Sequence, residues 1–125
     1  MMRIYLAGPM TGIPHFNYPA FNAAASALRA SGHIVFNPAE HDTELFGKDI
    51  SNPTGCAKQA ADDHGFDRRA ALKADLAWIC DNAEAIALLP DWQRSSGANA
   101  ERALAFALGL QIIELDASLS LEAAE

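Results

Sequence analysis

Four short apolar runs, separated by stretches with helical periodicity, constrain the fold of this chain more than any other feature. The runs are RIYLA at 3–7, HIVF at 33–36, EAIALL at 84–89 and LQIIEL at 110–115. Their length and their β-branched or aliphatic content are typical of buried strands. Strands that alternate with helices pair in parallel through right-handed crossovers. The sequence therefore predicts an α/β fold: a single doubly wound, flavodoxin-like domain over residues 1–125, with a mainly parallel sheet of four or five strands.

Three stretches between these runs are expected to be helical. The first begins near Asn17 and ends at Gly32, and the others cover about 66–80 and 97–108. Residues 37–65 are the least regular part of the chain and are rich in Pro, Gly and polar residues. We expect a long functional or mobile loop there. We expect the last ten residues to be a helical or frayed tail.

Composition limits the class of protein. At 125 residues, half of them hydrophobic, the chain can bury one core. Its formal net charge of −7 argues against a nucleic-acid polymer as partner, because phosphate backbones are bound by clustered Lys and Arg. No apolar run approaches the ~18 residues that a membrane span needs, and the N-terminus lacks the pattern of a signal peptide. We expect a cytoplasmic protein with no membrane partner.

Cysteine and histidine usage gives little sign of a disulfide or a metal. Cys56 and Cys80 suit a reducing compartment better than a disulfide framework. The four histidines do not have the spacing of a zinc site. Cys56 and His64 could contribute to a metal site, which is the weaker alternative. We therefore expect no metal and no cofactor.

Doubly wound sheets bind ligands beyond the carboxyl ends of their strands, where the strand order reverses. That rule selects two loops, one after the first strand and one after the third, at 90–97. The turn of the first loop has backbone N–H groups that could face an anion, although glycines are also common in ordinary strand-to-helix turns. The binding residues predicted in this first loop are Gly8, Pro9, Met10, Thr11 and Gly12.

The second loop ends in Ser95-Ser96-Gly97, directly before a predicted helix. One serine is expected to cap that helix. The other hydroxyl, with the free N–H groups near Gly97 and the positive end of the helix, is suited to hold a phosphate. Arg94 either adds charge there or is an ordinary solvated arginine.

Two carboxylates and a tyrosine are candidates for chemistry. Glu101 lies one turn into the helix after this loop. Its carboxylate either only stabilises the helix, through favourable interaction with the helix dipole, or is kept ionised by that dipole, as a nucleophile requires. Asp75, in the apolar stretch KADLAWI, is either solvated or placed beside a buried stripe, where an acid needs a partner or a function. Tyr5 either packs in the core or hydrogen-bonds the nucleophile. As a pair, the two acids fit glycoside chemistry, in which one traps an oxocarbenium-like state and the other handles the leaving group.

These segments resemble the nucleoside 2-deoxyribosyltransferase-like superfamily, which includes the 2′-deoxynucleoside 5′-monophosphate N-hydrolases. The likeness is carried by YLAGPMTG, ADLAWI, EAIALLPDWQRSSGA and GANAERALAFALGL, which cover most of the chain outside 37–65. It is strongest to a branch, common in phages and prophages, that opens with YLAGPMTG. The most specific element is Ser-x-Gly followed by a helix with Glu four residues after the Gly, about 25 residues beyond Asp-Leu.

The resemblance implies a role for each candidate. Glu101 would form a ribosyl-enzyme, Asp75 would bind the base or act as general acid, and Tyr5 would orient the glutamate. The glycine loop after the first strand would line the sugar and base site. Ser95, with Gly97 as a backbone donor, would bind a 5′-phosphate. Enzymes of this superfamily often complete each pocket with a residue from a neighbouring subunit, so we expect a homodimer or a higher homo-oligomer.

Three classes of function follow. The first is an enzyme that cleaves or transfers at the N-glycosidic bond of a (deoxy)nucleoside or its 5′-monophosphate, with the choice between water and a second base as acceptor left open. The second is a non-catalytic module that binds or sequesters a nucleotide or an NAD-derived ligand. A structural or interaction protein is the third. The acid pair favours catalysis, because a binder of anionic nucleotides gains nothing from two carboxylates.

Overall fold

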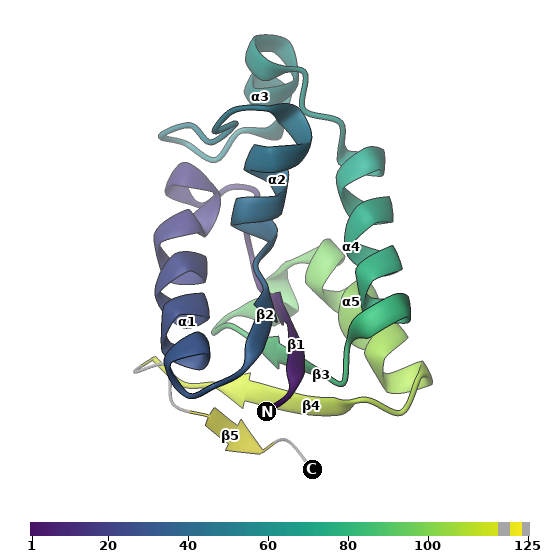
Figure 1. The fold of residues 1–125 in the computed structure, drawn as a ribbon. Helices are drawn as coiled ribbons and strands as arrows, with labels where there is room; N and C mark the ends of the chain where they lie inside the picture. The colour runs from purple at the N-terminus through teal and green to yellow at the C-terminus, as the bar shows by residue number, and fades with distance from the viewer. Residues whose placement is uncertain (118–120, 124–125) are drawn as a thin grey trace.

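The computed structural model describes residues 1–117 and 121–123, which form a five-stranded sheet flanked by helices (Figure 1). The strand order is β2-β1-β3-β4-β5; β1 to β4 pair in parallel, and β5 runs antiparallel to β4. The strands are β1 (Arg3–Ala7), β2 (Ile34–Phe36), β3 (Ala85–Leu88), β4 (Gln111–Leu115) and β5 (Leu121–Ala123). The predicted α/β fold with a parallel sheet is confirmed.

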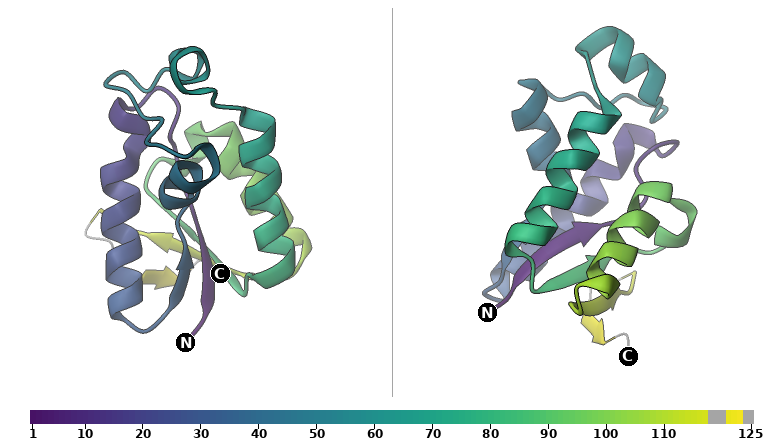
Figure 2. Two further views of the ribbon diagram at one scale, coloured as in Figure 1. Left: turned by 45° about the horizontal axis from the view of Figure 1, so that its top comes forward. Right: turned by 90° about the vertical axis from the view of Figure 1, so that its right-hand side faces the viewer.

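Within the described residues, five α-helices pack around this sheet. They are α1 (Tyr18–Ala30), α2 (Pro38–Phe46), α3 (Ala57–His64), α4 (Arg68–Asn82) and α5 (Ser96–Ala107), with short 3₁₀ turns η1 (Pro14–Asn17) and η2 (Trp92–Arg94). α1 covers one face of the sheet, α4 and α5 cover the other, and α2 and α3 lie beyond the carboxyl ends of the strands (Figure 1 and Figure 2). No helix in this part of the chain is both long enough and apolar enough to cross a bilayer.

Alternate side chains of β1 supply both layers of the core. Ile4 and Leu6 belong to the cluster that α1 completes with Phe21. Tyr5 belongs to the opposite cluster, which α4 completes with Ile79. All five side chains are at most 1 % exposed. A central strand covered on both faces is apolar throughout, which is why RIYLA carries no alternation of polar residues.

The point of strand reversal lies between β1 and β3. From β1 the chain crosses to β2 on one side, and β3 and β4 follow on the other. The loops after β1 and β3 therefore start next to each other at the carboxyl edge, and Leu89 N–H donates to the Ala7 carbonyl there, at 2.8 Å. This is the place at which doubly wound sheets form ligand sites.

The expectation that residues 37–65 form a long irregular loop is wrong, because two helices lie in this segment. Asn37 caps α2 by accepting from the Ala39 N–H, and Pro38 takes the first helical position, where no N–H is needed. Cys56 caps α3 through its sulfur, which accepts from the Gln59 N–H at 3.4 Å. Both helices are short and carry few apolar residues, so the pattern of the sequence conceals them.

The expected helical or frayed tail is also wrong where it can be judged. Residues 121–123 form β5, which pairs with the edge of β4 from Leu115 back to Ile113. Residues 118–120 and 124–125 of the predicted tail lie outside the described residues. Pairing with a distant edge strand is a non-local interaction, so local periodicity does not predict it.

The loop between α2 and α3 fastens the glycine loop after β1. Gly12 N–H donates to the Gly55 carbonyl, and His15 N–H donates to the Asn52 carbonyl, both at 2.8 Å. Asn52 in turn accepts from the Cys56 N–H and donates to the Cys56 carbonyl, which closes its own loop. A Cβ at Gly55 would overlap the backbone of Ile13, so only glycine allows this approach. The segment between β2 and α4 thus supports the carboxyl edge of the sheet.

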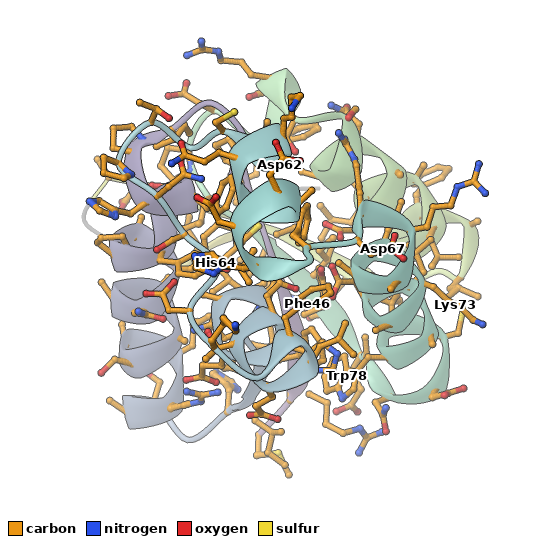
Figure 3. All side chains as sticks on the ribbon, turned by 90° about the horizontal axis from the view of Figure 1, so that it is seen from above. Phe46, Asp62, His64, Asp67, Lys73 and Trp78 are labelled. Atoms are coloured by element: carbon orange, nitrogen blue, oxygen red, sulfur yellow. The ribbon has the colours of Figure 1, made fainter. Side chains whose placement is uncertain are left out.

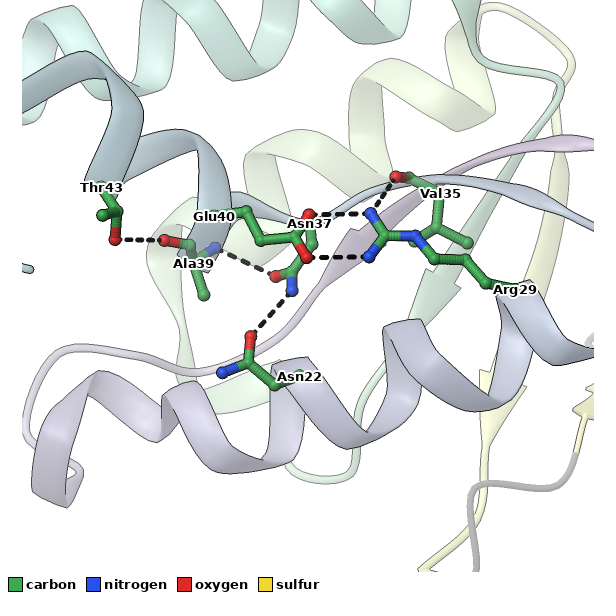
Figure 4. Close-up of polar contacts among 7 residues, drawn as sticks. All are labelled: Asn22, Arg29, Val35, Asn37, Ala39, Glu40 and Thr43. Carbon is green, nitrogen blue, oxygen red and sulfur yellow. Dashed lines mark hydrogen bonds and ion pairs between the residues drawn. The ribbon is translucent and has the colours of Figure 1, made fainter.

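A polar network around the buried Asn37 joins α2 to α1 (Figure 4). Asn37 is 2 % exposed and donates from Nδ2 to Asn22 Oδ1, while its own Oδ1 caps α2. Arg29 forms two 2.8 Å hydrogen bonds with the Glu40 carboxylate and a third, at 2.9 Å, with the Val35 carbonyl. The first turn of α2 is therefore held on two sides, and the orientation of its next turn is fixed.

Candidate active site

A cavity of about 420 Å³ opens at the carboxyl edge of the sheet, between the loops after β1 and β3. Its wall brings together every residue predicted for catalysis or substrate binding, although these come from three separate parts of the chain. The predicted residues in the wall are Tyr5, Gly8, Pro9, Met10, Thr11, Gly12, Asp75, Ser95, Gly97 and Glu101. Their roles in chemistry stay predictions. Figure 3 looks onto this edge and shows α2 and α3 between α1 and α4, with Phe46 near the middle.

A hydrogen bond between Tyr5 and Glu101 joins β1 to α5 at the floor of the cavity. The Tyr5 O–H donates to Glu101 Oε2 at 2.7 Å, across 96 residues of sequence. Tyr5 is fully buried and Glu101 is 6 % exposed. The tyrosine ring stacks on Phe36 at 5.3 Å and tilts against Trp78 at 6.5 Å. These ring contacts fix the direction of the hydroxyl, and hence the position of the carboxylate.

Asp75 reaches the same cavity from the middle of α4. It is 8 % exposed, so it is not the solvated helix residue that one interpretation of the sequence allowed. Its Oδ1 is buried and has no hydrogen-bond partner among the described residues. A buried carboxyl oxygen without a partner costs free energy unless the group is neutral or a ligand supplies a donor.

A third buried acid, Asp42, completes the group, and the sequence did not single it out. It lies on α2, lines the cavity and is 5 % exposed. The spacing of Ala39, Asp42 and Phe46 after an Asn-Pro cap is the signal that could have located it. Arg68, in the first turn of α4, is a second residue of the cavity wall that the sequence did not indicate.

Asp42, Asp75 and Glu101 line the same poorly solvated cavity, and burial raises the pKa of each. Burial raises the pKa of Glu101 to about 8, with the charge of Asp75 adding to the rise and the Tyr5 hydrogen bond opposing it. Burial raises the pKa of Asp75 to about 7, again opposed by Tyr5. Burial and then the charge of Asp75 raise the pKa of Asp42 to about 7. The expectation that the helix field keeps Glu101 ionised is therefore wrong for the empty cavity at neutral pH, because burial outweighs that field.

The glycine loop of the cavity is shaped by close contacts. A Cβ at Gly8 would lie 2.7 Å from Cβ of Leu89, so a larger residue there would push apart the two loops. The N–H of Ile13 closes a turn onto the Met10 carbonyl at 3.1 Å. The N–H of Gly12 already donates to Gly55 and so is not free to meet an anion.

At the mouth, the start of α5 combines a cap with nearby positive charge. Ser95 is the capping serine, since its Oγ accepts from the Ala98 N–H at 3.1 Å. Ser96 Oγ instead accepts from Arg68 Nη2 at 2.9 Å. Arg94 also lines the cavity. The hydroxyl proton of Ser95 remains available to a ligand, and the exposed N–H groups of the helix start lie beside it.

Residues 2–114 match a protein family described as a domain of unknown function, DUF4406. The chain belongs to this family. No curated protein and no solved structure matches the chain.

Within residues 1–117 and 121–123, no group of three or more His, Cys, Asp or Glu side chains is placed to hold a metal ion. Cys56 is exposed and engaged as the cap of α3, and His64 lies at the far end of that helix. The cavity wall offers buried carboxyls, a phenol and the donors at the start of α5.

Removal of the Glu101 charge should stabilise the DUF4406 domain, increasingly so as pH rises. Unfolded Glu101 loses its proton near 4.5, whereas the folded protein retains it to about 8. Between these values the unfolded state binds fewer protons, so stability falls with rising pH. Glu101→Gln removes that loss and retains an oxygen for Tyr5. We expect a gain on the order of a few kcal/mol in the free energy of unfolding at pH 8 and almost none at pH 4.

Urea unfolding of wild type and variant across this pH range checks the expectation. Glu44→Gln is the matched control, because Glu44 is exposed on α2 and its loss should leave the pH profile unchanged. A Glu101→Gln variant that is less stable than wild type at pH 8 would show that the native state holds an ionised, well-stabilised glutamate.

Proposed function

We propose that this chain cleaves or transfers at the N-glycosidic bond of a (deoxy)nucleoside or its 5′-monophosphate, with Glu101 as nucleophile. The single observation that carries the proposal is the arrangement at the cavity floor. Glu101 is oriented by a 2.7 Å hydrogen bond from Tyr5, and Asp75 presents an unpartnered carboxyl oxygen to the same space. An oriented carboxylate with a second acid beside it is the equipment of glycoside chemistry.

In the first step, Glu101 attacks C1′ of the sugar. A C1′–O bond forms to the carboxylate while the C1′–N bond breaks, and its electron pair leaves with the base. The proton of Asp75 passes to that base, so the base departs neutral. The raised pKa of Asp75, about 7, suits an acid that must hold a proton near neutral pH and then release it.

In the second step, an acceptor attacks C1′ of the glycosyl-enzyme. The acceptor is water in a hydrolase or a second base in a transferase. Its proton goes to the Asp75 carboxylate, the C1′–O bond to Glu101 breaks, and the starting state is restored. Tyr5 favours departure of the glutamate, because its O–H stabilises the carboxylate that is released.

The catalytic state holds one proton on this acid pair. Burial brings the pKa values of Asp75 and Glu101 to about 7 and about 8, so the pair titrates as a unit. The hydrogen bond from Tyr5 stabilises the ionised form of Glu101. In the empty cavity the higher pKa of Glu101 places that proton on the glutamate, and Tyr5 lowers the pKa of both acids. The reaction requires the other arrangement when substrate is bound, with Glu101 ionised and Asp75 protonated.

The sequence resemblance supports the same assignment. The nucleoside 2-deoxyribosyltransferase-like superfamily uses a helix glutamate after Ser-x-Gly, an Asp-Leu aspartate and a strand tyrosine, which match Glu101, Asp75 and Tyr5. The same cavity wall holds all of these residues. We propose membership of that superfamily on this basis.

Glu101→Gln should abolish turnover and leave the fold intact. The amide cannot serve as nucleophile, and its loss should cost ~10³-fold or more in rate. The assay is chromatography of the free base released from a panel of nucleosides and 5′-monophosphates, with and without an acceptor base. Glu44→Gln should retain the wild-type rate. Near-normal turnover by Glu101→Gln would remove the nucleophile assignment, and tight binding without any base release by wild type would indicate a binding module instead.

We also expect 5′-monophosphates to bind better than nucleosides, through Ser95 and the helix N–H groups. Ser95→Ala should weaken monophosphate binding about ten- to a hundredfold, the size expected for a charge-assisted hydrogen bond. Because Ser95 also caps α5, Ser95→Asp is the sharper variant. Aspartate retains the cap but places a negative charge against the phosphate.

Calorimetric titration in a Glu101→Gln background, which prevents turnover, measures both ligands. Ser95→Asp should weaken monophosphate binding more than Ser95→Ala does, and nucleoside binding should hardly change. Equal losses for nucleoside and monophosphate would show that Ser95 supports the loop and does not meet the phosphate.

A further inference from the structure

We propose that Asp42 selects the base: it accepts a hydrogen bond from an exocyclic amino group, so that the cavity takes amino-bearing bases in preference to their keto counterparts. The inference rests on the proposed function, since it concerns which leaving group that site accepts. It assigns a role to a buried acid that the reaction itself does not use.

The first observation is that Asp42 is buried but unsatisfied. It is 5 % exposed, and its Oδ1 has no hydrogen-bond partner in the described part of the chain. The ion pairs found among the described residues do not include it. A structural buried acid is normally paired or hydrogen-bonded, so an acid without a partner at a cavity wall indicates that a ligand supplies one.

The second observation is that Asp42 is held in place. The first turn of α2 is locked by the bonds of Asn37 to Asn22 and Ala39, and by the ion pair of Arg29 with Glu40 (Figure 4). Asp42 follows one turn after this locked segment. Anchoring of the α2 backbone keeps this buried carboxyl at the cavity wall, which is what a recognition residue requires.

The third observation is the composition of the cavity wall that Asp42 shares. Phe16, Ile50 and Phe66 line the cavity together with Asp42. Phe16 and Phe66 contact each other with ring centroids 6.3 Å apart. Apolar and aromatic surface with one polar group suits a flat heterocycle, because the ring is buried by the apolar wall and oriented by the acid. Elsewhere in the wall, Arg68, Arg94 and Ser95 provide positive charge and hydrogen-bond donors, which suit a phosphate.

The chemistry of the acid decides which heterocycle is preferred. An ionised carboxylate only accepts hydrogen bonds, so an N–H of an exocyclic amine satisfies it, as aspartate and glutamate do with the N4 amine of cytosine. A keto oxygen at the same position would leave two acceptors facing each other. A site built to bind an N–H discriminates strongly against the analogue that lacks it, because its buried acceptor is then unpaired.

The test uses two substrate pairs that exchange the exocyclic amine for a keto oxygen: deoxycytidine with deoxyuridine, and deoxyadenosine with deoxyinosine. In each keto member the neighbouring ring nitrogen carries an N–H, so a keto preference by wild type also counts against the proposal. The test is run at pH 8, above the Asp42 pKa of about 7, where the ionised carboxylate is the main form. Two readouts are taken for each pair: kcat/KM for base release, and the dissociation constant in a Glu101→Gln background. Wild type should prefer the amino member of at least one pair by about ten- to a hundredfold.

Asp42→Asn should reduce that preference to a few fold or reverse it, because the amide presents an N–H to the keto oxygen. Removal of a buried charge should not harm the fold, and Asp42→Ser, which should lose the preference without reversing it, serves if the amide variant does not fold. Glu44→Gln, an exposed acid two residues along the same helix, should retain the wild-type preference. Equal use of amino and keto members by wild type, or an amino preference that survives both Asp42 variants, overturns the proposal.

The outcomes separate this inference from the proposed function. Base release with no preference that depends on Asp42 refutes the role of Asp42 and leaves the glycosidase intact. An amino preference in the binding constants that Asp42→Asn removes, with no base release by wild type, supports the role of Asp42 and refutes the glycosidase.

Discussion

The hydrogen bond from Tyr5 to Glu101 is the interaction on which the candidate site depends. It joins the central strand to the last helix at the carboxyl edge of the sheet, across 96 residues, and it is buried from end to end. A buried carboxyl without a partner is among the more costly groups a fold can contain. Tyr5 supplies the partner of Glu101, because the reversal of strand order brings β1 close to the start of α5. The rest of the cavity is arranged around that pair.

Grouping Asp42, Asp75 and Glu101 in one cavity has a stability cost that the remainder of the fold must offset. Each acid has its pKa raised above the ordinary value, chiefly by burial, so each makes the folded state less stable as pH rises. The apolar core on both faces of β1 and the fastening of the glycine loop by Gly55 and Asn52 supply the compensation. Acids with raised pKa values concentrated at one sheet edge are typical of functional sites.

The sequence is sufficient for the four parallel strands and for the parts of the cavity wall formed by the loops after β1 and β3. RIYLA and EAIALL are buried on both faces, so their composition alone identifies central strands, and the reversal rule then places the ligand site at their carboxyl ends. It was not sufficient for α2 and α3, whose polar composition conceals their periodicity, and Asp42 was missed with them. Strand β5 depends on pairing with a distant edge, which no local pattern encodes. The ionisation state of Glu101 was misjudged because burial, a tertiary property, opposes the helix field.

The most direct test of the account is the stereochemistry of transfer to methanol. A β-nucleoside that the protein cleaves would be incubated in dilute methanol, and the anomeric configuration of the methyl glycoside read by NMR. Two successive displacements at C1′, the first by Glu101, retain the configuration. Wild type should form a β-methyl glycoside, and Glu101→Gln should form none. An inverted α-product, or cleavage of neither nucleosides nor their 5′-monophosphates, would contradict the account.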